Sequence, residues 1–404
     1  MVTFVLRRPI RLLVSLSGAL GLILAISGAE ALPESRAAII SYPGRLSGVS
    51  ALSPSNAWAV GGVVQSGAEK TLIMHWNGRG WSRVASPNPD GARSASLDGV
   101  SADSSRDAWA VGSYVTRSGK GRTLVLHWNG RTWRRVPSPD PGGASGSDLA
   151  AVSVLSRSRA WAVGGYFTSS GAQKTLVLRW NGDSWAKVAS PSRGVPPFSA
   201  LLSVSALSPS RAWAVGWSYF STADEQKTLV LRWNGTAWAQ EASPNPGPAG
   251  DIFAPLSGIS AVSPSNAWAV GNYLIRSSIA TLVLHWNGIK WAKVASPDPG
   301  RPNGTTSPTS ELDAVTARSR SNAWAVGDYS TSSGTLKTLI LHWNGSRWAK
   351  ATSPSPGRSL NFLYGVSAAS RSSVWAVGTT SSTSSGGNAR TLILHWNGPR
   401  WSRS

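Results

Sequence analysis

The sequence predicts an all-β protein, a seven-bladed β-propeller made of four-stranded antiparallel blades. One tryptophan-containing phrase recurs seven times at intervals of 51 to 56 residues. Each copy holds three tryptophans, which accounts for all but one of the 22 in the chain. Glycine (42) and proline (25) are frequent and charged residues make up only 14%, a composition that fits many short strands joined by turns. A repeat of about fifty residues with aromatic markers is typical of propellers.

The N-terminal segment, residues 1–31, reads as a secretory signal peptide. Arg7, Arg8 and Arg11 precede an apolar run over 12–28, and 29–31 (Ala-Glu-Ala) supplies the small-x-small cleavage site. An uncleaved anchor is the alternative, although the run is short for a bilayer span. We expect a secreted or extracellular protein with no membrane span after cleavage, and association with the cell surface stays open. The sequence contains no cysteine, which excludes disulfides and thiolate metal sites.

A lead-in, residues 32–45, separates the signal peptide from the repeats. Its segment 38–41 (Ala-Ile-Ile-Ser) is similar to 84–87 (Val-Ala-Ser-Pro), which form the end of the first copy. The last copy stops at Ser404 and lacks most of that strand. Because an open ring would leave unpaired strand edges, we predict that residues 38–41 complete or brace the last blade and so close the ring.

The repeats fill residues 46–404, which leaves no room for a second domain. In each copy we predict four strands, rich in Val, Leu, Thr and Trp. Asn-Gly follows the third strand in every copy and predicts a two-residue hairpin to the fourth. A Ser-Pro-x-Pro segment such as 86–89 ends the fourth strand, because proline cannot continue a ladder. The blades are expected at about 46–96, 97–148, 149–200, 201–255, 256–311, 312–362 and 363–404.

The repeated tryptophans are expected to pack between blades. All five histidines occupy one repeat position, just before the second tryptophan, where the third and fourth copies carry Arg179 and Arg232. Equivalent positions in seven blades are spread around a ring, so these side chains should not converge on one metal or one catalytic triad. No metal site, cofactor or catalytic residue is predicted.

The blade pattern resembles a known group. The phrase at 160–166, Ala-Trp-Ala-Val-Gly-Gly-Tyr, and the later Leu-x-Trp-Asn-Gly-x-x-Trp are similar to a kelch-type propeller blade. Secreted bacterial proteins built from Trp-Ala-Val-Gly and His-Trp-Asn-Gly repeats are more similar still, and most of them have no assigned function. The resemblance covers 46–404 and implies the propeller architecture. The glycine pair of kelch blades is present only at 61–62 and 164–165. The Ser-x-Asp-x-Gly-x-x-Trp box of sialidase-like propellers is not matched.

The sequence places its diversity at one end of the ring. The connections between strands two and three, and between strand four and the next blade, vary, and alternating strands put both at the same end, here called the variable-loop face. Rigid scaffolds present function on such loops. The candidate ligand-binding residues are the aromatic cluster Trp217, Tyr219 and Phe220, the tyrosines Tyr114, Tyr166, Tyr273 and Tyr329, and the cations Lys70, Arg122, Lys174, Lys227, Lys337 and Arg390. The alternative is that the rings cap strand ends and the cations are solvated.

The charge balance indicates polyanionic partners. Lysine and arginine total 39 against 18 acids, a net charge of +21, although a need for solubility could explain this too. We predict a non-catalytic propeller that binds glycans, anionic cell-envelope polymers or protein partners through the variable-loop face. The alternative is a propeller-type hydrolase, lyase or mutarotase, which sparse acids disfavour. The predicted export and the lack of a known nucleic-acid-binding module disfavour nucleic acid as the ligand.

Overall fold

The computed structural model describes residues 41–404, except 144, 195–196, 222–223, 249–251, 304–306 and 385–387. The chain divides into two units, 1–38 and 39–404, and every described residue belongs to the second. The predicted signal peptide at 1–31 and residues 38–40 of the lead-in lie outside the described residues.

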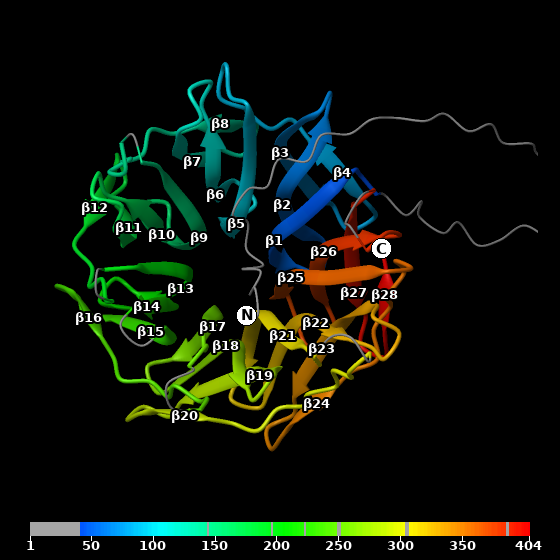
Figure 1. Ribbon diagram of the computed structural model, residues 1–404. Helices are drawn as coiled ribbons and strands as arrows, with labels where there is room; N and C mark the ends of the chain where they lie inside the picture. Colours follow the sequence, from blue (N-terminus) through cyan, green and yellow to red (C-terminus); the bar gives the residue numbers. More distant parts are fainter. Residues whose placement is uncertain are drawn as a thin grey trace, which may run out of the picture. The chain divides into compact units, whose positions relative to one another are not determined.

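Within the described part of the chain, the strands form seven four-stranded antiparallel sheets. Each sheet uses four consecutive strands in the order of the sequence. Figure 1 shows the sheets standing around a common axis, with the first strand of each innermost and the fourth outermost. The predicted seven-bladed propeller is confirmed.

The strands have similar bounds from blade to blade. The first strands are β1 (Gly44–Ser53), β5 (Ser94–Ser104), β9 (Ser147–Ser156), β13 (Ser199–Ser208), β17 (Leu256–Ser263), β21 (Ser310–Ser319) and β25 (Leu360–Ala368). The second strands are β2 (Asn56–Gln65), β6 (Asp107–Val115), β10 (Arg159–Phe167), β14 (Arg211–Phe220), β18 (Asn266–Ile275), β22 (Asn322–Ser330) and β26 (Val374–Ser381). The third strands are β3 (Ala68–Trp76), β7 (Gly121–Trp128), β11 (Gln173–Trp180), β15 (Glu225–Trp233), β19 (Ser278–Trp286), β23 (Leu336–Trp343) and β27 (Arg390–Trp396). The short fourth strands are β4 (Trp81–Val84), β8 (Trp133–Arg135), β12 (Trp185–Val188), β16 (Trp238–Gln240), β20 (Trp291–Lys293), β24 (Trp348–Lys350) and β28 (Trp401–Arg403).

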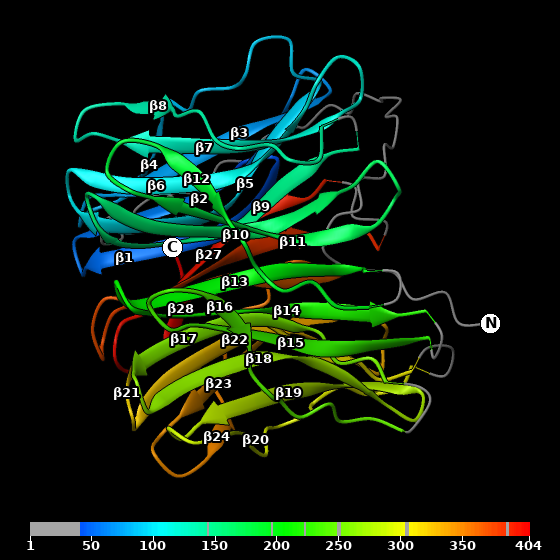
Figure 2. The ribbon, with the colours of Figure 1, turned by 90° about the vertical axis from the view of Figure 1, so that its left-hand side faces the viewer.

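Antiparallel order places the connections at two ends of the ring, as Figure 2 shows from the side. The hairpins after Asn-Gly differ from the prediction. Trp76 pairs with Trp81, so four residues rather than two separate the strands. Gly78 takes a positive φ of 93°, whereas the Asn77 side chain accepts hydrogen bonds from the backbone N–H groups of Arg79 and Gly80 at 2.9 and 3.0 Å. The asparagine therefore closes the loop with its side chain, as in an Asx-turn.

A glycine ends the Trp-Ala-Val-Gly run in every blade because strand one bulges against it. In the third blade the register shifts between the Val163 and Gly164 pairs of β10 with β9. A Cβ atom at Gly164 would overlap the carbonyl oxygen of Asp148, whereas one at Gly165 would meet only ordinary or slightly tight neighbours. The first glycine of the pair is thus required by close backbone approach, and the second is not.

Tryptophans lock each blade to the next. The Trp375 ring of blade seven lies 4.8 Å from Trp76 and 5.0 Å from Trp81 of blade one, and it meets Trp81 edge-on. The same edge-on contact joins Trp58 of blade one to Trp133 of blade two. These rings are buried, except that Trp76 keeps part of its surface exposed. The predicted packing of tryptophan between blades is therefore observed, and it also joins the last blade to the first.

Two further sets of contacts join blade one and the end of the lead-in to blade seven. In the innermost layer the Ala51 N–H donates to Ser367 Oγ of blade seven at 3.0 Å, as Ala102 does to Ser50 of blade one. At the variable-loop face Tyr42 and Thr391 form two hydrogen bonds, both at 2.9 Å. The Tyr42 N–H donates to the Thr391 side-chain oxygen Oγ1, and the Thr391 N–H donates to the Tyr42 carbonyl. The end of the lead-in therefore lies against blade seven.

Candidate functional site

The four predicted tyrosines stand near the ends of their second strands, toward the variable-loop face. Each is paired in register with the residue that the sequence marks as a cation position on the third strand. Tyr114 pairs with Arg122, Tyr166 with Lys174 and Tyr329 with Lys337. Paired residues of neighbouring strands lie side by side, so the structure brings these predicted residues together. Tyr273 pairs instead with Ala280, and its ring is buried.

A second cation, which the sequence analysis missed, comes from the fourth strand of the same blades. Lys187 donates a hydrogen bond to Tyr166 Oη at 3.1 Å, and Lys350 donates one to Tyr329 Oη at 3.0 Å. Their ammonium groups stand 4.4 and 4.2 Å from the ring centroids, within the range of a cation–π contact. Arg135 with Tyr114 and Lys293 with Tyr273 repeat the pair. The sequence pattern that could have predicted this second cation is a lysine or arginine two residues after the third tryptophan of the blade.

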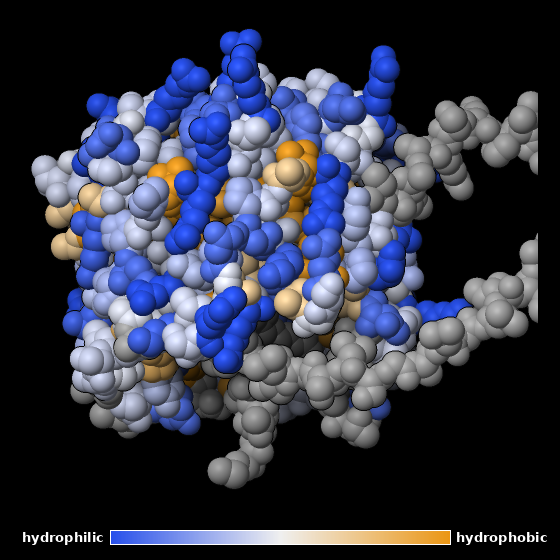
Figure 3. Space-filling model, turned by 90° about the horizontal axis from the view of Figure 1, so that it is seen from above, coloured by the Kyte–Doolittle hydropathy of each residue, from blue (hydrophilic) through white to orange (hydrophobic). Residues whose placement is uncertain are grey.

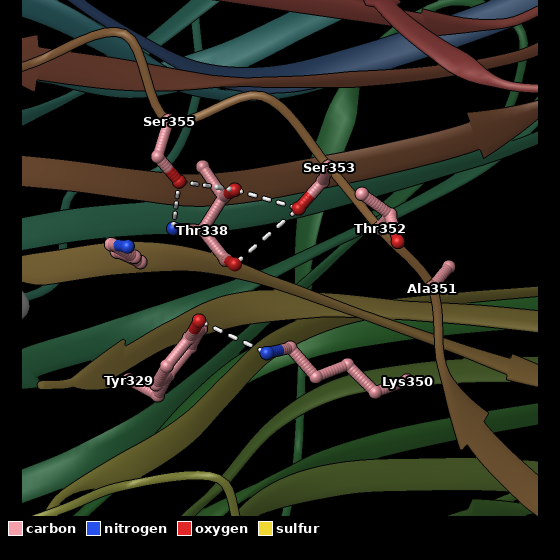
Figure 4. A pocket seen from close by; sticks show the side chains of 8 residues that line it. Tyr329, Thr338, Lys350, Ala351, Thr352, Ser353 and Ser355 are labelled. Atoms are coloured by element: carbon pink, nitrogen blue, oxygen red, sulfur yellow. Dashed lines mark hydrogen bonds between the residues drawn. The ribbon is translucent and has the colours of Figure 1, made fainter.

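In blades three and six these residues line equivalent hollows. The hollow of blade six has a volume of about 410 Å³ and that of blade three about 380 Å³. Figure 4 shows the blade-six hollow from close by, with Lys350 reaching Tyr329 across it. Its lining is Tyr329, Lys337, Thr338, Lys350, Ala351, Thr352, Ser353 and Ser355. The lining in blade three is Tyr166, Lys174, Thr175, Lys187, Ala189, Ser190, Ser192 and Pro197.

Hydroxyl groups fix one wall of each hollow. In blade six the Thr338 N–H donates to Ser355 Oγ at 3.1 Å, and the Thr338 and Ser353 hydroxyls lie 2.8 Å apart. Thr175 makes the same bonds to Ser192 and Ser190 in blade three. The Ser-Pro-x segment that ends each fourth strand is thus tied to the start of the third strand. Both linings combine two lysines with hydroxyls and contain no carboxylate.

The aromatic residues of blade four separate into two sets. Trp217 and Tyr219 alternate with Ser218 and Phe220 along β14, so the two pairs face opposite sides of the sheet. Phe198, which the sequence analysis missed, lies 5.9 Å from Trp217 and 6.3 Å from Tyr219 between ring centroids. These three rings form a platform, here called the aromatic platform. Phe220 lies apart from it, under the ammonium group of Lys227.

An acid holds the outer edge of the aromatic platform. Tyr219 Oη donates to Asp224 Oδ1 at 2.7 Å, and this hydrogen bond raises the pKa of the tyrosine hydroxyl. The hydroxyl therefore stays protonated at neutral pH, and the ring is held in one orientation by its own loop.

Three predicted cations are used within the fold, and one of them, Arg122, forms an ion pair with Asp140. Lys227 forms an ion pair with Glu225 at 2.7 Å. Arg390 donates to the Ser41 carbonyl at 2.5 Å and holds the end of the lead-in. Lys70 stands on β3 opposite Val63 rather than opposite a tyrosine. The structure therefore gathers only part of the predicted cation set into a site with tyrosine.

The histidines lie in the interfaces between blades. His395 stacks on Trp375 at 4.0 Å and His342 on Trp324 at 4.1 Å. Burial lowers the pKa values of both imidazoles. Arg179 replaces the imidazole in blade three with a cation–π contact over Trp161. Within the described ranges, no three His, Asp or Glu side chains gather where they could hold a metal ion.

The surface carries many extended polar side chains. Figure 3, which views the ring from its side, shows hydrophilic side chains projecting from the surface and separating small hydrophobic patches. Of the residues that are described, none belongs to a helix long and apolar enough to cross a membrane.

Comparisons with known proteins identify an architecture. No protein-family model matches the sequence, and no curated protein does. Among solved structures, the chain is similar to the BP39L lectin from Burkholderia pseudomallei, with 13% identity, a TM-score of 0.53 and coverage of 90% of this chain and 98% of that one. It is also similar to YCF48 bound to D1 peptide, with 14% identity, a TM-score of 0.50 and coverage of 88% and 93%. A third similar structure is the propeller domain of the trilobed protease from Pyrococcus furiosus, which has an open velcro topology, with 7% identity, a TM-score of 0.51 and coverage of 90% and 96%.

The chain is a seven-bladed β-propeller. Identities this low show the fold alone, because one propeller scaffold serves many unrelated functions. The kelch-like resemblance drawn from the repeat sequence stays a prediction.

Proposed function

We propose that this propeller is a secreted, non-catalytic binding protein that takes an anionic glycan or cell-envelope polymer on its variable-loop face. The observation that carries the proposal is the tyrosine–cation pair repeated in four blades. Tyr166 with Lys187 and Tyr329 with Lys350 are two of these pairs. A polymer with regularly spaced charges can contact several blades at once, which multiplies weak individual contacts. Export rests on the sequence of residues 1–31.

The aromatic platform supports a sugar-bearing ligand. Trp217 and Tyr219 are only partly buried, and such rings can stack on the apolar faces of sugars. The positive charge of the chain favours a ligand that carries carboxylate or phosphate groups. The similar propeller structures include a lectin and a peptide complex, so a protein partner is the second candidate. The aromatic platform is the surface that favours it, because aromatic rings are enriched at protein interfaces.

Retention on immobilised polysaccharide tests the proposal. Residues 32–404 are passed over an acidic polysaccharide and over a neutral one of similar length, and the eluate is analysed for released sugars. We expect retention on the acidic polymer, progressive loss of retention as salt rises above about 0.15 M, and no released sugars. Replacing both Trp217 and Tyr219 by alanine should weaken retention at low salt.

Three outcomes would count against this function. Equal retention on the neutral and acidic polymers would remove the electrostatic argument. Released sugars that disappear on mutation of acids on the variable-loop face would favour the enzyme alternative. Retention that is unchanged in the Trp217→Ala/Tyr219→Ala variant would exclude the aromatic platform from the contact.

A further inference from the structure

Blade two shows how a carboxylate can occupy the position of the hollow. Its third-strand cation, Arg122, forms an ion pair with Asp140, and Tyr114 stands opposite this arginine on the second strand. Asp140 lies 17 residues after Thr123, the first buried threonine of the third strand. The blade's own carboxylate thus meets the cation beside the tyrosine, and this contact raises the pKa of Arg122.

Blades three and six keep the cations and lack the acid. The residues 17 positions after the equivalent threonines are Ser192 and Ser355, which bind those threonines instead. Lys174 and Lys337 take the place of the arginine. Among the described residues, neither ammonium group has an ion-pair or hydrogen-bond partner. Lys187 and Lys350 add a second ammonium group to each hollow.

We infer that the hollows of blades three and six are two equivalent binding sites for a carboxylate group of an acidic sugar. In each site one ammonium group comes from the third strand and one from the fourth, and the tyrosine comes from the second strand. The carboxylate takes the role that Asp140 has in blade two. Two lysines with no acid in the lining favour an anion, since each charge-assisted hydrogen bond is stronger than a neutral one. This inference rests on the proposed function for its ligand class.

The remaining blades differ from these two in the groups that make the site. Blade five has Ala280 in place of the third-strand cation. In blade four Glu225 already neutralises Lys227, and Gln240 replaces the fourth-strand cation. Blade one carries Val63 and blade seven Thr380 in place of the tyrosine. The internal repeats therefore single out the third and sixth blades.

Calorimetric titration with trigalacturonate measures both affinity and the number of sites. For residues 32–404 we expect a stoichiometry of about two. Ser192→Asp with Ser355→Asp should fill both hollows with the protein's own carboxylates, as in blade two, and abolish the heat of binding. Asp140→Ser should free Arg122, which stands beside Tyr114 and Arg135, and add a third site. Lys174→Ala with Lys337→Ala should weaken binding by about tenfold or more.

A matched control carries the same charge change at the opposite end of the same blades. Ser184 and Ser346 lie in the exposed Asn-Gly hairpins, so Ser184→Asp with Ser346→Asp should leave the binding heat unchanged. Loss of binding in this control, an unaltered binding curve in the Ser192→Asp/Ser355→Asp variant, or a stoichiometry that stays at two in Asp140→Ser would each overturn the inference. Circular dichroism confirms that each variant is folded.

Retention on the polysaccharide separates this inference from the proposed function. Retention of the wild-type chain on the polysaccharide, with no binding of trigalacturonate in the calorimeter, would contradict the two-site inference and remain consistent with the proposed function. Saturable binding of trigalacturonate at two sites without retention on any polymer would support the two-site inference and contradict the proposed function.

Discussion

One repeat position shows how a single residue serves the fold. The residue before the second tryptophan contacts the first tryptophan of its blade, as a stacked imidazole in His342 and His395 or as an overlying guanidinium in Arg179. Both groups are flat and can lie on an indole face. The histidines are therefore packing residues, as their repetition predicted.

This position makes stability depend on pH. Burial lowers the pKa values of His342 and His395 below the ordinary 6.5. The unfolded chain then binds protons before the folded chain does, so the free energy of unfolding is retained above about pH 6.5 and falls as the pH drops through the window below it. We expect Tm to decrease between about pH 7.5 and pH 5.5. The His342→Gln/His395→Gln variant should show a smaller decrease, and an equal decrease in both proteins would contradict this account.

At the scale of the element, the second strand of blade three requires a glycine at position 164, whereas a larger residue can replace Gly165. Gly164→Ala would drive a methyl group into the Asp148 carbonyl of β9, so strand one must shift. We expect a loss of stability in urea unfolding above about 2 kcal/mol. Gly165→Ala is the matched control and should cost less than about 1 kcal/mol, because only the Gln173 side-chain tip must give way. Equal losses would show that the bulge does not set the requirement.

The strands and their contacts also show which features could be predicted from the sequence. The number and order of the strands and the packing of the tryptophans could be predicted from patterns that repeat, because every blade packs the same residue types against its neighbour. The hollow in blade six escaped prediction because it joins Tyr329 to Lys350, which are 21 residues apart and meet only across an intervening strand. Phe198 was missed for a similar reason, since it stands on a connection outside the repeated phrase. The hairpin was mispredicted because Asn77 uses its side chain rather than a left-handed backbone.

At the scale of the whole ring, the lead-in supplies blade seven with bonds that the other blades make for themselves. In blade six Thr338 is bonded by the Ser-Pro-x segment after its own fourth strand. In blade seven Thr391 is bonded instead by Ser41 and Tyr42. We propose that this segment braces the closed ring.

Truncation tests this brace. A chain of residues 44–404 should unfold at a lower temperature than one of residues 32–404, because the Thr391 backbone loses its partners and a buried polar group left unpaired is costly. Tyr42→Ala, which keeps the backbone bonds, should lie closer to the longer chain. Identical Tm values for the two lengths would show that the Trp375 contacts and the Ala51–Ser367 hydrogen bond close the ring without the lead-in.

Because each sheet is one unbroken stretch of sequence, a blade can pair its strands soon after its roughly fifty residues have left the ribosome, since domains generally begin folding during synthesis. The wedge of Trp375 against Trp76 and Trp81 is different, since its two sides are made at opposite ends of translation. Until then Trp76 and Trp81 lack their partner from blade seven, and this exposed surface is where a nascent chain would most need a chaperone.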